Sequence, residues 1–152
     1  MIVVAIIGIL ASLAISAYQT YVVRVQVAEG LGFAGGAKAP IVDAYNNTGI
    51  PPVDRAAAGM PTLATDTRGS FVSAVDIIDG RIEITFGNQV HQDAFGDTLS
   101  VTPYQTPGGS FLWRCGYAPA PANATELSGG GVAAVHQPST IEERYLPRTC
   151  RQ

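Results

Sequence analysis

Charged residues are scarce in this sequence of 152 residues: they make up 14% of it, and Lys38 is the single lysine. The formal net charge is −3, so the chain lacks the overall positive field that attracts nucleic acid, although composition leaves a local basic patch open. With 17 glycines and 10 prolines, the composition favours a loop-rich domain with strands over a charge-dense helical bundle.

The sequence also lacks the short motifs of common enzyme classes: there is no G-x-S-x-G, no H-E-x-x-H and no phosphate-binding glycine loop. We interpret His91 and His136 as solvated rather than catalytic. Asp93 and Asp97 could join a calcium site, but two aspartates in a loop more often only solvate it. No catalytic activity, small-molecule substrate, metal or cofactor is therefore expected.

Only two cysteines are present, Cys115 and Cys150. Their spacing does not match a zinc site, and two histidines supply few further ligands. One disulfide, formed outside the cytoplasm, is the favoured interpretation, with two reduced buried cysteines as the alternative. In the chain-entropy model, closing a loop of this length stabilises a domain by about 3 to 4 kcal/mol.

One long hydrophobic run contrasts with this composition. Residues 1–23, MIVVAIIGILASLAISAYQTYVV, contain no charged side chain and no proline. As a helix the run would be about 35 Å long, enough to cross a hydrocarbon core of about 30 Å. Because residues 1–10 leave no polar face, this helix must lie in lipid or inside other protein. A signal peptide is the alternative, but the run is too long for one and continues without a turn into helix-like sequence.

From Arg24 the pattern becomes amphipathic without a break. Apolar residues recur at helical steps: Val27, Leu31, Ala34, Ile41 and Tyr45. The pattern predicts a helix over 24–46 that ends within Asn46-Asn47-Thr48-Gly49. Glycines and Pro40 predict a kink or loosened turn over residues 35–40. Residues 47–69 are expected to form an irregular connection, which at this length is usually functional or exposed.

Alternating residues then predict an antiparallel sheet over residues 70–117. A strand over 71–78 meets the hairpin dipeptide Asp79-Gly80, and a strand over 81–86 follows with its charged residues outward and its apolar residues inward. A short third strand is expected at 98–102, a turn at 106–109 and a fourth strand at 110–117. The fourth strand carries Trp113, interpreted as a core anchor, and Cys115. The tail from residue 118 should be mostly coil, pinned to this strand by the disulfide.

Several segments together resemble the type IV pilins of Gram-negative bacteria. They are MIVVAIIGILASLAISAYQTYVVR at the start, VAEGL at 27–31, GRIEITFGN at 80–88, SFLWRCG at 110–116 and RYLPRTCR at 144–151. The Trp-x-Cys strand with the Tyr-Leu-Pro-x-x-Cys ending is similar in particular to major pilins whose C-terminal loop is closed by a disulfide. The apolar start alone would also fit the pseudopilins of type II secretion.

The resemblance implies an α+β fold, with a long N-terminal α-helix packed on a four-stranded antiparallel β-sheet and a loop-rich C-terminal region closed by a disulfide between Cys115 and Cys150. It divides the chain into an apolar transmembrane and filament-core half, 1–23, and a globular domain, 24–152. Within the domain it expects the helix 24–46, the connection 47–69, the sheet 70–117 and the disulfide-closed loop 115–150. The expected filament-core side chains are Ile2, Val3, Val4, Ile6, Ile7, Ile9, Leu10, Leu13 and Ile15.

The implied function is that of a pilus subunit. Such a subunit is held in the inner membrane, handed to the pilus assembly machinery and polymerised with identical subunits into an extracellular filament for adhesion, twitching motility and DNA uptake, with direct nucleic-acid binding left open. The alternatives are a type II secretion pseudopilin and a membrane-tethered periplasmic binding domain.

Two features of the family bear on the first helix. Family members carry a basic leader, a cleavage site, a methylated phenylalanine and a glutamate just before the position of Met1, so these are expected upstream of the sequence given. Ser16 stands where the family usually has proline, so the resemblance leaves open whether the family's local helix break occurs here. A serine can bend a helix slightly by bonding back to a carbonyl.

Overall fold

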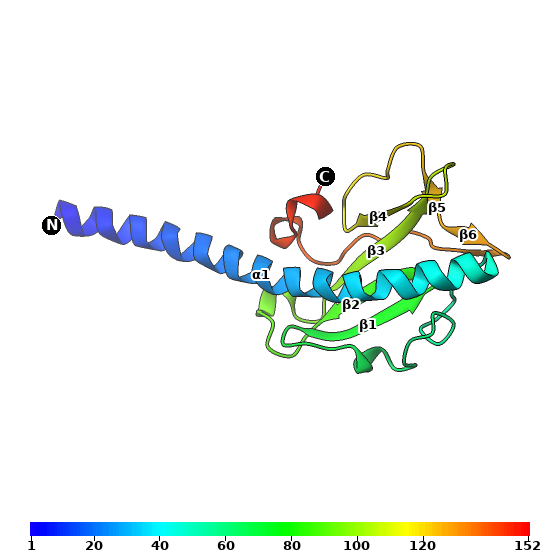
Figure 1. Cartoon of the computed structure of the whole chain (residues 1–152). Helices are drawn as coiled ribbons and strands as arrows, with labels where there is room; N and C mark the ends of the chain where they lie inside the picture. Colours follow the sequence, from blue (N-terminus) through cyan, green and yellow to red (C-terminus); the bar gives the residue numbers. More distant parts are fainter.

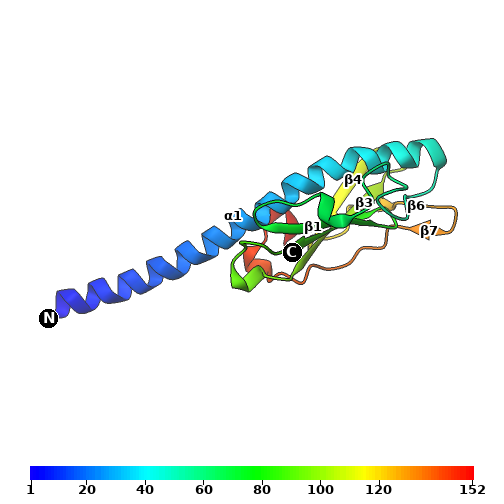
Figure 2. The same cartoon turned by 90° about the horizontal axis from the view of Figure 1, so that it is seen from below.

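The computed structural model describes all 152 residues as one long helix with a sheet packed on its second half (Figure 1). Helix α1 spans Ile2–Thr48, 47 residues, and is therefore about 70 Å long. Its first half projects away from the rest of the chain, and a view turned by 90° shows the same projection (Figure 2).

Helix α1 ends where the sequence predicts, to within two residues. Gly49 adopts the left-handed conformation with φ of 69°, and its N–H donates to the Tyr45 carbonyl oxygen at 2.7 Å. A kink or loosened turn was expected over residues 35–40, and the structure shows no interruption of the helix there, which continues through Pro40. Ala34, Ala37 and Ile41 are buried against the domain, and this packing outweighs the weak helix propensity of the neighbouring glycines.

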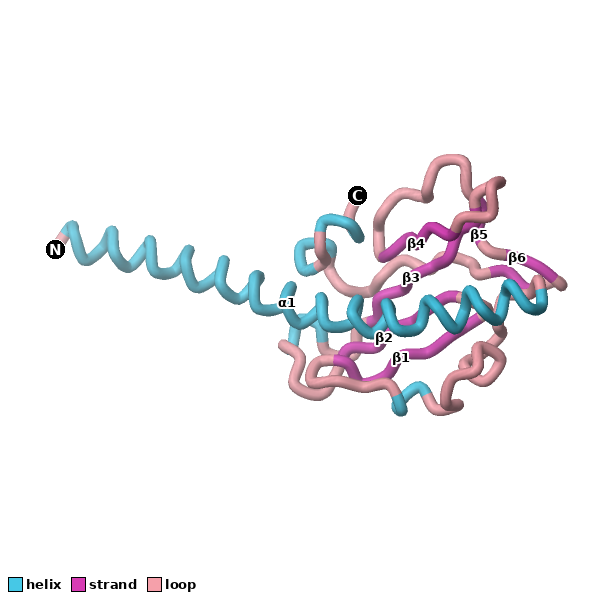
Figure 3. Tube along the Cα trace, in the orientation of Figure 1, coloured by secondary structure: helices cyan, strands magenta, loops and turns pink.

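The sheet under α1 is antiparallel with strand order β1-β2-β3-β4 (Figure 3). The strands are β1 Val72–Ile78, β2 Arg81–Phe86, β3 Thr98–Gln105 and β4 Phe111–Cys115. The hairpin between β1 and β2 turns at Asp79 and Gly80, with φ of 52° and 84°, as the dipeptide predicts. The irregular connection over 47–69 contains one short helical turn, η1 Ala64–Asp66.

Strand β3 is longer than the sequence predicts. It runs past Pro103 to Gln105 because it pairs with β4 along one side and with a short strand, β5 Thr125–Glu126, near its end. Proline lacks an N–H but keeps its carbonyl, and the Pro103 carbonyl accepts a hydrogen bond from the Leu127 N–H at 3.0 Å.

The tail returns over the sheet and ends beside α1. It forms a small hairpin, β6 Ser128–Gly129 with β7 Val132–Ala133, and the short helical turns η3 Glu143–Tyr145 and η4 Arg148–Cys150, while η2 Gln92–Ala94 lies between β2 and β3. A disulfide joins Cys115 at the end of β4 to Cys150, as predicted. The Tyr117 N–H donates to the Cys150 carbonyl oxygen at 2.9 Å, so backbone bonding reinforces this covalent link.

One hydrophobic core joins α1, the sheet and the tail. The helix contributes Val23, Val27, Ala34, Ala37 and Ile41, and β2 contributes Ile82, Ile84 and Phe86, which face inward as predicted. Helix and sheet pack closely at Gly30, where an added Cβ would lie 2.7 Å from Cζ of Phe86 and 3.1 Å from Cγ2 of Ile84. The absence of a side chain at this position therefore sets the distance between helix and sheet.

Gly30→Ala is expected to lower the free energy of unfolding by about 1 to 2 kcal/mol, because the new methyl group overpacks a filled core. Gly36→Ala is the matched control, since Gly36 lies on the same helix and faces open space. The control should gain up to about 1 kcal/mol from helix propensity. Chemical unfolding of the detergent-solubilised chain, followed by Trp113 fluorescence, measures both, and a stabilising Gly30→Ala would refute this close contact.

Two side chains differ from their predicted positions. Arg81 was expected to face outward but is buried, because its Nη1 donates to the Val135 carbonyl oxygen at 2.7 Å and its Nη2 pairs with Glu83 at 3.3 Å. Trp113 is half-buried at the margin of the core rather than inside it. The ammonium of Lys38 lies 5.2 Å from the centre of its ring, and burial lowers the pKa of that lysine.

Candidate assembly surface

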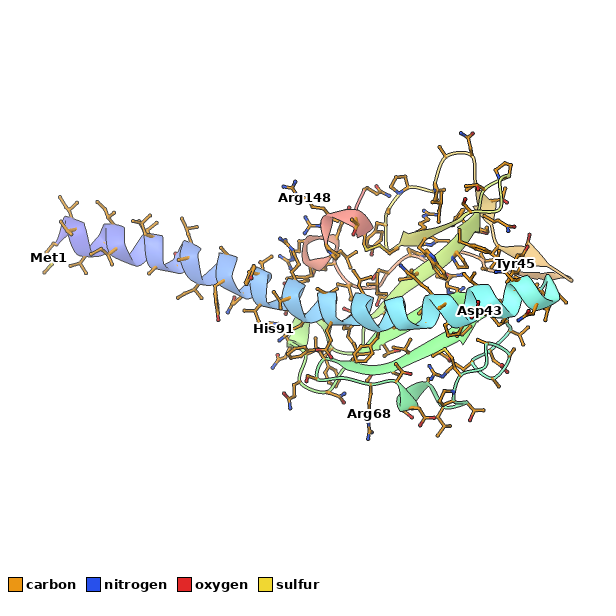
Figure 4. The ribbon with its side chains drawn as sticks, in the orientation of Figure 1. Met1, Asp43, Tyr45, Arg68, His91 and Arg148 are labelled. Carbon is orange, nitrogen blue, oxygen red and sulfur yellow. A yellow bond between two sulfur atoms is a disulfide. The ribbon has the colours of Figure 1, made fainter.

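The first half of α1 has no partner within the chain. Its residues are exposed from Ile2 to Tyr18, and the first buried residue is Val23. By length and composition this helix could cross a membrane, and none of the apolar window is buried. Figure 4 shows its side chains projecting in all directions. The apolar surface therefore extends around the whole helix.

The predicted filament-core side chains all lie on this exposed segment. Each is at least half exposed: Ile2, Val3, Val4, Ile6, Ile7, Ile9, Leu10, Leu13 and Ile15. Their exposure places them where a neighbouring molecule could contact them, while their role in a filament stays a prediction.

Two of the hydroxyl groups on this segment are bonded to its own backbone. Ser12 Oγ donates to the Ile9 carbonyl oxygen at 2.8 Å, and Thr20 Oγ1 donates to the Ser16 carbonyl oxygen at 3.2 Å. The helix continues unbroken through Ser16. A continuous helix pairs its backbone polar groups internally, which suits this segment to lipid or to an apolar protein interior.

The domain holds α1 firmly at the point where the exposed half ends. Arg24 Nη2 donates to the Arg144 carbonyl oxygen at 2.8 Å, and the His91 N–H donates to Gln26 Oε1 at 2.8 Å. Val23, beside these contacts, is fully buried. The exposed half is therefore the continuation of a helix that η2 and η3 hold in place from two sides.

Asp93 and Asp97, considered above as calcium ligands, instead join the η2 region to the tail. Asp93 Oδ2 accepts a hydrogen bond from the Tyr145 hydroxyl at 2.6 Å, which raises the pKa of that tyrosine, and Asp97 Oδ1 accepts one from Thr140 Oγ1 at 2.8 Å. The structure gathers no group of three or more histidine, cysteine, aspartate or glutamate side chains that could hold a metal ion.

His91 and His136 have different surroundings. His91 is partly exposed, and its Nδ1 lies 3.6 Å from Asp93 Oδ2. His136 was expected to be solvated, but it lies between β3 and the disulfide. Its Nδ1 is 3.0 Å from Thr102 Oγ1 and its Nε2 is 2.9 Å from the Gly116 carbonyl oxygen. A neutral ring that donates from Nε2 and accepts at Nδ1 satisfies both contacts.

Acid is expected to destabilise the domain through His136. Burial, and then the positive charge of Arg114, lower the pKa of this histidine below its usual value of 6.5. Because the folded pKa is depressed, stability is fully present above the unfolded pKa and is lost as pH falls through the folded pKa. The melting temperature of the native chain should decrease once the pH drops below about 6.5. The decrease should be less steep in His136→Gln. His91→Gln is the control, and an equal flattening in that variant would contradict the assignment.

Sequence patterns missed one residue that organises the connection over 47–69. Arg55 is 1% exposed, and its guanidinium is held by neutral acceptors. Nε donates to the Pro61 carbonyl oxygen at 2.7 Å, Nη2 donates to Thr67 Oγ1 at 2.9 Å, and Nη1 donates to the Val75 carbonyl oxygen on β1. No local pattern marks this arginine, because its partners lie 6, 12 and 20 residues farther along the chain, on the loop and on a strand.

An apolar helix that is exposed on every side continues into a disulfide-closed sheet domain. This arrangement defines a class of subunit whose apolar surface must be covered by neighbouring copies or by lipid. A family model described as pilin, a bacterial filament protein, matches residues 23–151. This chain belongs to the pilin family. That family is one of structural subunits, not of enzymes.

Relatives match over nearly the whole chain. A type IV major pilin of Neisseria gonorrhoeae is 34% identical over 99% of this chain and 82% of its own length. A fimbrial protein of Neisseria meningitidis is 35% identical over 99% of this chain and 89% of its own. A type IV major fimbrial protein of Dichelobacter nodosus is 30% identical over 100% of this chain and 91% of its own. These matches confirm the resemblance seen in the sequence.

Proposed function

We propose that this chain is the structural subunit of a type IV pilus, which polymerises through the exposed half of α1 into an extracellular filament for adhesion and twitching motility. The observation that carries the proposal is the apolar segment over residues 2–22, of which the chain itself buries no residue and leaves nearly all exposed. DNA uptake is a further role of such a filament. The chain acts by assembly, without catalysis of its own.

Assembly exchanges one apolar environment for another. Before assembly the segment lies in the inner membrane, with the globular domain on the periplasmic side and the pilus assembly machinery as its partner. In the filament, the apolar side chains from Ile2 to Ile15 contact the same segment of identical subunits. Contacts repeated head to tail that do not close into a ring extend without limit. Because lipid and a helix core are equally apolar, close packing must supply the register.

The experiment that tests this function is recovery of filaments from cells that express the intact gene. Filaments sheared from the cell surface should contain this chain as their main component by mass spectrometry, and deletion of the gene should remove both filaments and twitching. If the chain stays monomeric in membranes and no filament contains it, the proposal fails. Recovery only in a short assembly required for protein export would identify a secretion pseudopilin instead.

The disulfide has a role in filament yield. Replacing Cys150 by serine is expected to lower the free energy of unfolding by about 2 to 4 kcal/mol and to loosen residues 118–152, because the tail loses its covalent link to β4. The measurements are the rate of limited proteolysis within the tail and the amount of surface filament. A reductant should reproduce the effect in the native chain, and a melting temperature that reductant leaves unchanged would count against it.

A further inference from the structure

The end of the globular domain that faces the exposed half of α1 carries an unusual set of side chains, here called the collar. Its members are Tyr18, Tyr21, Phe95, Arg144, Arg148 and Arg151. The tyrosines occupy the last turns of α1 before Val23, while Phe95 ends η2 and the arginines belong to η3, η4 and the end of the chain. In Figure 4, His91 beside η2 and Arg148 lie on opposite sides of α1, close to the point where the helix leaves the domain.

The collar exposes aromatic side chains that do not pack into the hydrophobic core of the domain. Tyr18 and Tyr21 are 68% and 63% exposed, and Phe95 is 64% exposed. Tyrosine is enriched where a membrane helix crosses the boundary between hydrocarbon and water. Tyr18 and Tyr21 lie in the last turns of the apolar segment before Arg24, the first charged residue of α1, which places them at that boundary.

The collar also holds Arg148, an exposed arginine without a carboxylate partner. Arg24 Nη2 and Arg151 Nη2 both donate to the Arg144 carbonyl oxygen, at 2.8 and 3.0 Å, and Nε of Arg24 is buried with no hydrogen-bond partner. The Arg148 side chain has no ion pair or hydrogen bond. Of the nearby carboxylates, Glu142 pairs with Arg144 at 2.7 Å and Glu143 accepts the Gln152 N–H at 2.7 Å. The unpaired guanidinium of Arg148 is therefore suited to phosphate oxygens.

We propose that the collar is a membrane-interface surface that rests the globular domain of the unassembled subunit on the leaflet from which α1 emerges. Phe95 inserts at the boundary between headgroups and acyl chains, and the arginines, Arg148 foremost, bind the phosphates of anionic phospholipids. The surface is continuous with the apolar segment, which is why lipid rather than another molecule is its occupant. The inference rests on the membrane stage of the proposed function and adds a defined orientation of the domain to it.

The test uses the full chain in vesicles of phosphatidylcholine, with and without phosphatidylglycerol, that contain lipids brominated near the headgroup. Phe95→Trp places a fluorescent probe in the collar, and native Trp113 supplies the background. Val53→Trp is the control, because Val53 is also exposed but lies far from the collar. It lies beside Thr48, and Thr48 is about 38 Å farther along α1 than Val23. The brominated lipids should quench the probe at position 95 and leave the probe at position 53 unquenched.

The phosphate contacts are tested by adding Arg148→Gln to Phe95→Trp. One arginine near an anionic surface should shift the equilibrium between the domain in contact with the membrane and the domain free of it about fivefold. The substitution should therefore weaken quenching in vesicles with phosphatidylglycerol and change it little in phosphatidylcholine alone. Equal quenching with and without Arg148 in the anionic vesicles would overturn the phosphate contacts.

Other outcomes separate this inference from the proposed function. If the chain floats with the vesicles and the probe at position 95 stays unquenched, the membrane-interface surface is wrong while the pilus function stands. If position 95 becomes shielded only at high ratios of protein to lipid, a second copy of the chain covers the collar instead of lipid. A chain that does not float with the vesicles would overturn both the membrane stage and the collar.

Discussion

Replacing Leu10 by lysine is expected to reduce filament formation to near zero. Leu10 is 61% exposed in the middle of the uncovered segment, where the proposed filament surrounds it with apolar side chains of other copies. A charge at the centre of an apolar span costs about 3 kcal/mol. With tenfold for each 1.4 kcal/mol, the yield of sheared filament should fall more than about 100-fold.

Leu63→Lys is the matched control for this substitution. Leu63 is 62% exposed, as Leu10 is, but lies on the connection over 47–69 rather than on α1. Both variants add one positive charge in place of an equally exposed leucine, so they differ only in location. An immunoblot of sheared filaments should show the wild-type amount for Leu63→Lys, and equal yields from both variants would contradict a filament core built from α1.

Replacing Arg55 by methionine is expected to lower the free energy of unfolding by about 3 kcal/mol or more. The substitution leaves the Pro61 carbonyl, the Val75 carbonyl and the Thr67 hydroxyl without their donor. The bond to Val75 is buried and the other two are partly buried, and a buried group left unpaired costs about 1 to 3 kcal/mol. Arg55→Lys should not restore stability, because one ammonium group cannot reproduce the planar fork that reaches all of these acceptors.

Arg68→Met is the control for Arg55, because Arg68 lies on the same connection and is exposed. It should change stability by less than about 0.5 kcal/mol. Trp113 fluorescence during chemical unfolding measures the change, and limited proteolysis reports whether the connection over 47–69 has opened. Wild-type stability in Arg55→Met, or full recovery in Arg55→Lys, would show that the connection is held by other contacts.

Features that depend on neighbouring residues were predictable from the sequence. The apolar repeat set the buried face of α1, Gly49 set its end, and Asp79-Gly80 set the first hairpin. Strand β3 was predicted too short because its extension depends on β5, a partner far along the chain. The unbroken path of α1 through Pro40 likewise depends on packing against the sheet.

Polar residues were the main source of error, since their partners are distant in sequence. Arg81 is buried because the Val135 carbonyl meets it, and His136 is held by Thr102 and Gly116. Arg55 gave no signal at all. Local alternation treats every charged residue as solvated, and only the folded tail and connection show which of them are not.

The assembly surface was the most predictable part of the function, because exposure of an apolar helix follows from its composition. Its partner lies outside the single chain, so the division at residue 23 and the filament-core roles stay predictions. The collar could not be predicted, because it forms only when Arg144, 120 residues beyond Arg24, returns to the same turn of α1.

A cryo-electron microscopy reconstruction of the native filament tests the proposed assembly most directly. It should show residues 2–22 of neighbouring copies in contact along the filament axis, with the sheet domains outside and the side chains from Ile2 to Ile15 shielded from solvent. A filament in which the sheet domains form the axial contacts, while residues 2–22 remain free of other copies, would contradict it.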